Sequence, residues 1–402
     1  SFVKTCFVEY VLGKNYFFGT NKPLKAYPYL NKDIECEVLI IGGGINGAIL
    51  NYYLSKNHNV VLAEQGKIGC CLTSVATALL EYQLDDFAND LQKKMTIKQI
   101  VDCYNLGLMA IEKLDDLISQ IGNKCFYSKR ASLLFSASKK NDKKIEEEYL
   151  FRKSHGFDCE LITSDNNPFD FEISSGIYCK NGGAEFDPYL FTKQMIENAK
   201  NQSQIFEHTK VVEYKRQKDY FLAKTLYATI KAKKIIISTG FNFELINKEI
   251  ADRFVSYGII ANPHCKKNIF NNTLVQDTNS SYHYARALPN GKIIFGGEDT
   301  KFNQKYLGLK KAEKKYKKLA DTLKKMFPNV QFDIEEEFCG MFASTPNNMG
   351  YIGKTNEKDV FYFFSCGANG ILNAIFCTDL IEDILAGKKN KYEKIFSPLR
   401  DE

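Results

Sequence analysis

The sequence predicts an α/β fold with a parallel sheet at its core, and three observations lead to this prediction. Residues 36–41 form a short apolar run of the kind found in buried parallel strands, and a glycine-rich turn and a helical stretch follow it. A second apolar run covers residues 59–63. A third covers residues 360–365 and leads into another glycine turn and a predicted helix over residues 371–385.

Composition indicates an ordinary globular protein. The chain has 402 residues, of which 44% are hydrophobic and 25% charged, so it can bury a large core and is expected to form two or three lobes. This balance excludes an intrinsically disordered or collagen-like chain. The net charge of +6 comes mainly from lysines spread along the chain, so no nucleic-acid partner is expected.

The cysteines and apolar segments indicate the compartment. The 12 cysteines contain no Cys-x-x-Cys pair, so we expect reduced thiols and no metal site. Residues 1–15 lack the order of a signal peptide, and the uncharged stretch 360–376 is interrupted by glycines and asparagines. We therefore expect a cytoplasmic protein without an integral membrane segment.

The turn after the first apolar run has the spacing of a dinucleotide-binding site. Gly42 permits a tight turn, Gly44 lets the backbone approach a pyrophosphate, and Gly47 lets the helix pack against the strand. The helix start, including Ile45 and Asn46, offers free N–H groups to phosphates. Glu64 ends the second apolar run, where a carboxylate can accept hydrogen bonds from ribose hydroxyls. Glu64 also disfavours a 2′-phosphate.

Two further segments favour a flavin over a nicotinamide. Residues 65–80 are rich in small side chains, which can run close under an isoalloxazine ring, and the chain is then expected to turn helical. The second glycine turn, near the C-terminus, can close a flavin site. The cofactor-binding candidates in these two segments are Gln65, Thr73, Ser74, Ala76, Thr77, Ala78, Gly367, Asn369, Gly370 and Ile371.

These residues resemble the D-amino-acid oxidase-like family of FAD-dependent oxidoreductases, which includes glycine oxidase and monomeric sarcosine oxidase. The resemblance covers roughly residues 27–387. Residues 207–211 are similar to the strand whose valine, here Val211, meets the adenine. Residues 235–240 resemble an apolar strand ending in Thr239 and Gly240, and Gly340 lies in the return to the cofactor domain. FAD is expected to bind without a covalent link, since Cys339 is one residue out of register with the family's attachment site.

The resemblance implies two interleaved domains. A discontinuous Rossmann-like FAD-binding domain is expected over residues 1–85, 157–240 and 345–402. A substrate domain of the α+β type, built on a mixed sheet, is expected over residues 86–156 and 241–344.

The resemblance also implies a reaction, the oxidation of an amine or amino-acid-like substrate by hydride transfer to flavin N5, with O2 or a quinone or other carrier as electron acceptor. Two departures argue against a simple α-amino acid. Phe342 stands where amino-acid oxidases of the family carry an arginine that clamps the substrate carboxylate. No lysine follows Gly370, where sarcosine-type enzymes have one.

A predicted hairpin over residues 282–297 supplies the other pocket candidates. Strand alternation puts Tyr282 and Arg286 on one face and His283 on the other, and we expect the Tyr282 face to meet the flavin. Arg286 is a candidate for binding a substrate anion, with a salt bridge to Glu298 or Asp299 as the alternative. Tyr282, Arg286 and Phe342 are thus the candidate catalytic or pocket residues.

Two other functions remain open at this point. A flavin enzyme of this type can oxidise a C–OH bond, as relatives acting on 2-hydroxy acids or glycerol phosphate do. The missing carboxylate clamps would also suit a non-catalytic FAD-bound protein of redox sensing or assembly.

Overall fold

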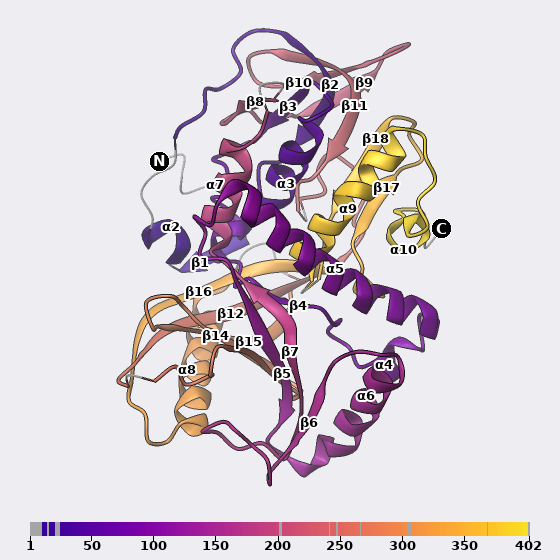
Figure 1. Cartoon of the computed structure of the whole chain (residues 1–402). Coiled ribbons are helices and arrows are strands. Elements are labelled where there is room, and N and C mark those ends of the chain that lie inside the picture. The colour runs from indigo at the N-terminus through magenta and orange to yellow at the C-terminus, as the bar shows by residue number, and fades with distance from the viewer. Residues whose placement is uncertain are drawn as a thin grey trace.

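The structure, a computed structural model, describes residues 10–13, 16–20, 25–200, 203–240, 242–246, 248–265, 267–303, 307–367 and 369–400. Two sheets dominate this part of the chain and occupy opposite ends of the molecule in Figure 1. The long helix α5 (Ile97–Ile121) crosses between them in that view. A capping box begins this helix, in which Thr96 and Gln99 each satisfy a backbone N–H of the other.

The smaller sheet has eight described strands, and its central part is parallel, as expected. Its main path runs β17-β18-β11-β2-β3-β8, with β10 and β9 attached to one side. The strands are β2 (Ile34–Ile41), β3 (Val60–Ala63), β8 (Ser203–Phe206), β9 (Glu213–Arg216), β10 (Phe221–Lys224), β11 (Thr229–Ile237), β17 (Tyr351–Lys354) and β18 (Val360–Phe364).

Three helices pack around this sheet: α3 (Ile45–Leu54), α7 (Pro188–Glu197) and α9 (Gly370–Leu385). The predicted apolar runs at 36–41, 59–63 and 360–365 correspond to the buried strands β2, β3 and β18. Strands β18, β11, β2 and β3 are parallel neighbours in this sheet, which confirms the Rossmann-like part of the expected fold.

The larger sheet is mixed and has ten described strands. Its path runs β1-β16-β12-β15-β14-β13-β5-β7-β4, with β6 paired to β7. The strands are β1 (Val11–Gly13), β4 (Leu79–Glu81), β5 (Ser128–Ser136), β6 (Glu160–Thr163), β7 (Ser175–Glu185), β12 (Asp252–Pro263), β13 (Thr273–Asp277), β14 (His283–Ala287), β15 (Ile293–Lys301) and β16 (Phe332–Ser344).

The helix α8 (Leu309–Met326) packs on β12, β15 and β16 with the apolar face that its sequence predicts. The remaining helices are short or peripheral. They are α2 (Tyr16–Thr20), α4 (Ala88–Leu91), α6 (Asp142–Ser154) and α10 (Glu393–Phe396).

Two local expectations differ from the structure. Residues 207–211 do not form a strand: β8 ends at Phe206, and a loop follows it. The chain after residue 80 does not turn helical but completes strand β4, because residues 79–81 pair with β7. Strand β7, after residue 157, pairs in the larger sheet with β5, before it, and with β6. The division into two domains, with its boundaries, stays a prediction.

The glycine turn holds α3 against β2 with no room for a side chain. Gly42 has φ +114°, and a Cβ placed on Gly47 would lie 1.9 Å from the carbonyl oxygen of Gly42. The first turn of α3 is therefore held against the end of β2 by backbone contact alone.

We expect Gly47→Ala to lower the free energy of unfolding by roughly 1–3 kcal/mol, since the added methyl group must displace backbone rather than a flexible side chain. Chemical denaturation measures this change. Gly19→Ala is the matched control, because Gly19 also lies within a helix, α2, and a Cβ there would meet nothing within 4 Å. Equal effects of the two substitutions would contradict the packing argument.

Candidate functional site

One cavity of about 510 Å³ is lined by residues of both sheets. Its walls include the glycine turn after β2, the segment 71–81, the loop after β8, and residues of β12, β14 and β16. The sequence-predicted residues that line it are Gly42, Gly44, Ile45, Asn46, Glu64, Gln65, Thr73, Ala76, Thr77, Ala78, Val211, Thr239, Gly240, Tyr282, Gly340, Phe342, Gly367, Asn369, Gly370 and Ile371.

Three predicted residues do not line this cavity, and each has another role. Gly47 makes the helix contact described above. Ser74 is fully buried, and its hydroxyl donates to the carbonyl oxygen of Cys71 at 2.6 Å. Arg286 is buried outside the cavity.

The start of α3 opens onto the cavity. A Cβ on Gly44 would meet only Thr73 Oγ1, at 3.4 Å, so the backbone there is accessible to a bound group. Thr73 lies beside this turn, and its hydroxyl oxygen accepts the N–H of Ile45 at 3.0 Å. A helix N-terminus that is free on its cavity side suits the phosphates of a dinucleotide.

Glu64 fixes the loops on either side of it. Its two carboxylate oxygens accept the N–H groups of Gly43 and Gly66, both at 2.7 Å. Burial raises the pKa of Glu64, and the two backbone hydrogen bonds oppose that rise. The carboxylate faces the cavity at the end of β3, where the sequence predicts contact with ribose hydroxyls.

A second buried carboxylate holds the loop that carries Val211. Glu207 is 3% exposed and accepts the N–H groups of Tyr27 and Ile68, at 3.0 and 2.9 Å. Two residues on, Thr209 donates its N–H to the carbonyl oxygen of Glu64 at 2.8 Å. These contacts fix the loop at the cavity although it is not the strand that the sequence predicts. The accessible glycine backbone and the ribose-side carboxylate fit an FAD molecule.

The hairpin of β14 and β15 forms part of the opposite wall. Tyr282 and Tyr284 line the cavity, and His283 does not, as strand alternation predicts. The hydroxyl of Tyr282 donates to Oδ2 of Asp299, so the oxygen of Tyr282 keeps its capacity to accept a hydrogen bond. Tyr284 shares a hydrogen bond with Ser256 at 2.9 Å.

Arg286 does not lie in the pocket, and its partner is neither Glu298 nor Asp299. It is 1% exposed and donates to the carbonyl oxygens of Thr77 and Phe186 at 2.7 and 2.9 Å. Its ion-pair partner is Glu185 on β7, at 3.6 Å. Arg286 thus supports the Thr77 loop from behind, and it is not available to bind a substrate anion.

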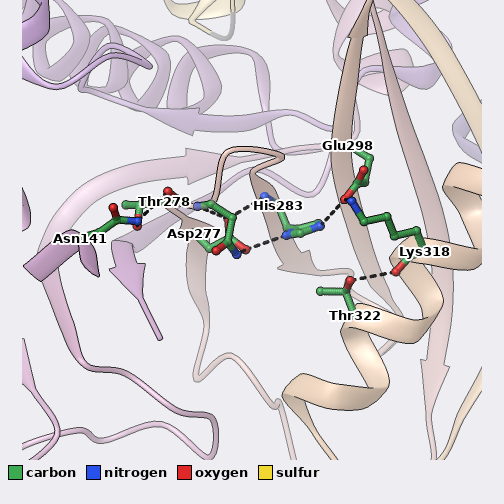
Figure 2. Close-up of polar contacts among 8 residues, drawn as sticks. Asn141, Asp277, Thr278, His283, Glu298, Lys318 and Thr322 are labelled. Atoms are coloured by element: carbon green, nitrogen blue, oxygen red, sulfur yellow. Dashed lines mark hydrogen bonds and ion pairs between the residues drawn. The ribbon is translucent and has the colours of Figure 1, made fainter. Parts of the chain in front are cut away.

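A chain of polar contacts lies behind the hairpin, on the face away from the cavity (Figure 2). His283 contacts Asp277 Oδ2 through Nδ1 at 2.7 Å and Glu298 Oε1 through Nε2 at 3.2 Å. Glu298 is fully buried with φ +56°, and it accepts Lys315 and Lys318 of α8 at 2.8 and 2.6 Å. These contacts join α8 to an irregularity, or bulge, in the pairing of β15 with β12, where Glu298 lies. The residue after Glu298, Asp299, accepts the hydrogen bond from the hydroxyl of Tyr282.

The same contacts set the charge of His283. Burial by itself lowers the pKa of this imidazole, but Asp277 and Glu298 outweigh burial, and the pKa is raised. The positive charges of Lys315 and Lys318 face Glu298, and the ring of Phe295 stacks on the imidazole at 5.6 Å.

Several wall residues were not predicted from the sequence. Among them are Glu81, Gln83, Asp85 and Gln276. Strand β4 has three residues and no alternation to mark its cavity face. Of the cysteines considered above, Cys339 is buried and does not line the cavity. None of the described cysteines forms a disulfide.

The described residues contain no candidate metal centre and no candidate membrane-spanning helix. No group of three or more His, Cys, Asp or Glu side chains there could hold a metal ion. None of the helices in that part of the chain is both long and apolar enough to span a membrane.

We expect Glu64→Ala to weaken FAD binding roughly tenfold to a hundredfold, because charged hydrogen bonds are lost both to the loops and to the ribose. Fluorescence titration of the apoprotein with FAD measures the dissociation constant. Glu35→Ala is the matched control, since Glu35 lies on the adjacent strand β2 with its side chain 73% exposed. Unchanged affinity in Glu64→Ala would exclude this role.

We expect His283→Gln to lower the free energy of unfolding by about 3 kcal/mol at pH 6, because it leaves the buried Asp277 without its cation, whereas Glu298 keeps Lys315 and Lys318. A raised pKa stabilises the fold below the ordinary histidine pKa, and this contribution is lost as pH rises through the raised value. The effect should therefore be smaller at pH 9 in denaturant titrations. His264→Gln, at an exposed pair with Asp333, should cost less than about 1 kcal/mol. An effect that grows with pH would contradict the assignment.

The comparisons with known proteins agree with this geometry. The family described as "FAD dependent oxidoreductase" matches residues 37–384. A putative Rieske 2Fe-2S iron-sulfur protein of Bacillus subtilis is 23% identical, over 96% of this chain and 75% of that protein. Glycine oxidase of Bacillus subtilis is also 23% identical, over 88% of this chain and 94% of that enzyme.

The solved structures show the same fold. Glycine oxidase from Geobacillus kaustophilus superposes with a TM-score of 0.78 at 16% identity, over 91% of this chain and 99% of that one. The family match covers most of the chain and includes both the glycine turn and the hairpin wall. The chain belongs to the D-amino-acid oxidase-like family of FAD-dependent oxidoreductases.

Proposed function

We propose that the protein oxidises the C–N bond of an amine or amino-acid-like substrate. The observation that carries this proposal is the hydroxyl of Tyr282, a residue that lines the cavity: it donates its hydrogen bond to Asp299, so its oxygen is left as an acceptor. An acceptor of this kind suits the N–H of an amine. When bound, FAD accepts the hydride equivalent from the carbon next to the nitrogen.

The chain's own residues bind and orient the reactants. The glycine turn and Glu64 hold the cofactor, and the proposed residues at its other end are Gly367 to Ile371. Tyr282 and Tyr284 orient the substrate amine, and Phe342, stacked on Phe254 at 5.6 Å, supplies an apolar wall that excludes water. Phe342 also replaces the arginine that would bind an α-carboxylate.

The electron acceptor and the compartment complete the proposal. We take the acceptor to be O2 or a quinone or other carrier, which oxygen consumption and dye reduction distinguish. Free cysteines throughout the described chain support a reducing, cytoplasmic location. No nucleic-acid partner is expected.

We expect anaerobic addition of an amine to bleach the flavin absorbance of the holoenzyme, and 2-hydroxy acids to leave it unchanged. A stopped-flow spectrometer records the rate for each class. Bleaching by 2-hydroxy acids alone would favour oxidation of a C–OH bond. A flavin that dithionite reduces, but no substrate does, would favour a non-catalytic FAD-bound protein.

The same assay tests the role of Tyr282. Tyr282→Phe should lower kcat/KM for the amine about tenfold, the effect of losing one hydrogen bond to the substrate. Tyr29→Phe is the control, because Tyr29 is 51% exposed and does not line the cavity. A wild-type rate in Tyr282→Phe would remove Tyr282 from the site.

A further inference from the structure

One end of the cavity is acidic. Glu81 and Asp85 line it beside Gln83, on the segment that runs from β4 toward α4. Among the described residues that line the whole cavity, none is an arginine or a histidine. The single lysine among them, Lys210, lies on the adenine-side loop and pairs with Glu244 at 2.8 Å.

Glu81 has an unused acceptor at this end. The residue is 6% exposed, and its Oε1 has no hydrogen-bond partner within the described chain. Gln83 contacts the carboxyl group, yet its own Oε1 is buried and likewise without a partner. Two acceptors thus lie two residues apart in the wall, and leaving such groups unpaired in a buried site is costly.

Among the described residues, no cation forms an ion pair with Glu81. The buried Arg152, whose charge acts on Glu81, contacts Glu148 at 2.8 Å, and both side chains of that pair are at most 2% exposed. Burial raises the pKa of Glu81 to about 8, with Gln83 and Arg152 opposing the rise only in part. A carboxyl group in this state becomes charged when a cation binds beside it.

We propose that Glu81 and Gln83 bind a cationic group of the substrate, remote from the C–N bond that is oxidised. The substrate class is then a diamine or guanidino-amine without a carboxylate at that end. This inference rests on the proposed amine oxidation for the identity of the reacting group, but the cation site itself can be measured without turnover.

The experiment uses the FAD-loaded protein and two short aliphatic probes of opposite charge, butylguanidine and butyrate. Each is titrated against the flavin absorbance spectrum to obtain a dissociation constant. We expect butylguanidine to bind and butyrate to bind at least about tenfold more weakly, because only the cation can pair with a carboxylate. Tighter binding of butyrate, or no binding of butylguanidine, would overturn the proposal.

A variant locates the site. Glu81→Gln keeps the shape of the side chain and should weaken butylguanidine binding about tenfold or more. Glu160→Gln, an exposed glutamate on β6, is the matched control and should bind like the wild type. An unchanged constant in Glu81→Gln would assign the cation elsewhere and overturn the proposal. Should Glu81→Gln fail to retain FAD, Gln83→Met tests the second acceptor in the same titration.

The two proposals fail in different ways. If butylguanidine binds through Glu81 but no amine bleaches the flavin, the cation site stands and amine oxidation is wrong. If amines bleach the flavin but Glu81→Gln binds butylguanidine normally, oxidation stands and the cation site is wrong.

Discussion

The contact between Gly47 and the carbonyl oxygen of Gly42 is the constraint on which the site depends. It brings the start of α3 onto the end of β2, and so places free backbone N–H groups at one end of the cavity. Glu64 then ties the same turn to the loop at Gly66. The cofactor half of the site is therefore built largely from backbone, which the carboxylates of Glu64 and Glu207 hold in place.

The other half depends on side chains that two layers of contacts hold in place. On the cavity side, Tyr282, which directly precedes β14, donates its hydroxyl hydrogen bond to Asp299. On the opposite face, His283 and Glu298 tie the hairpin to α8 (Figure 2). Glu298 and Asp299 are consecutive residues at the same bulge of β15. The bulge therefore positions both the buried ion pairs of Glu298 and the hydroxyl of Tyr282.

The sequence predicted the cofactor half well, because phosphates and ribose require particular groups at short, fixed spacings. It predicted the faces of β14 by alternation, yet it assigned the wrong partner to Arg286. That partner, Glu185, lies 101 positions away in the chain on β7, and no local pattern reports such a contact. The strand expected over residues 207–211 rested on the family resemblance and not on a local pattern, since Val211 is the one apolar residue there.

The substrate half was mostly beyond prediction. Glu81 is the last residue of β4, which has only three residues. Its extended conformation depends on pairing with β7 and not on a pattern within the segment itself. The burial of Glu81, its missing partner and the absence of a basic neighbour among the described wall residues all come from tertiary packing. The substitution of Phe342 for an arginine was visible in the sequence, but only the cavity shows that no arginine or histidine among its described lining residues replaces it.

We propose that one cavity holds the cofactor at the glycine turn and a cationic group of the amine substrate beside Glu81 on β4. A crystal structure of the FAD-loaded protein with butylguanidine tests it most directly. The account predicts phosphate density at the start of α3 and the guanidinium group within hydrogen-bonding distance of Glu81. A guanidinium group bound outside the cavity, or FAD phosphates away from Gly42 to Gly47, would contradict it.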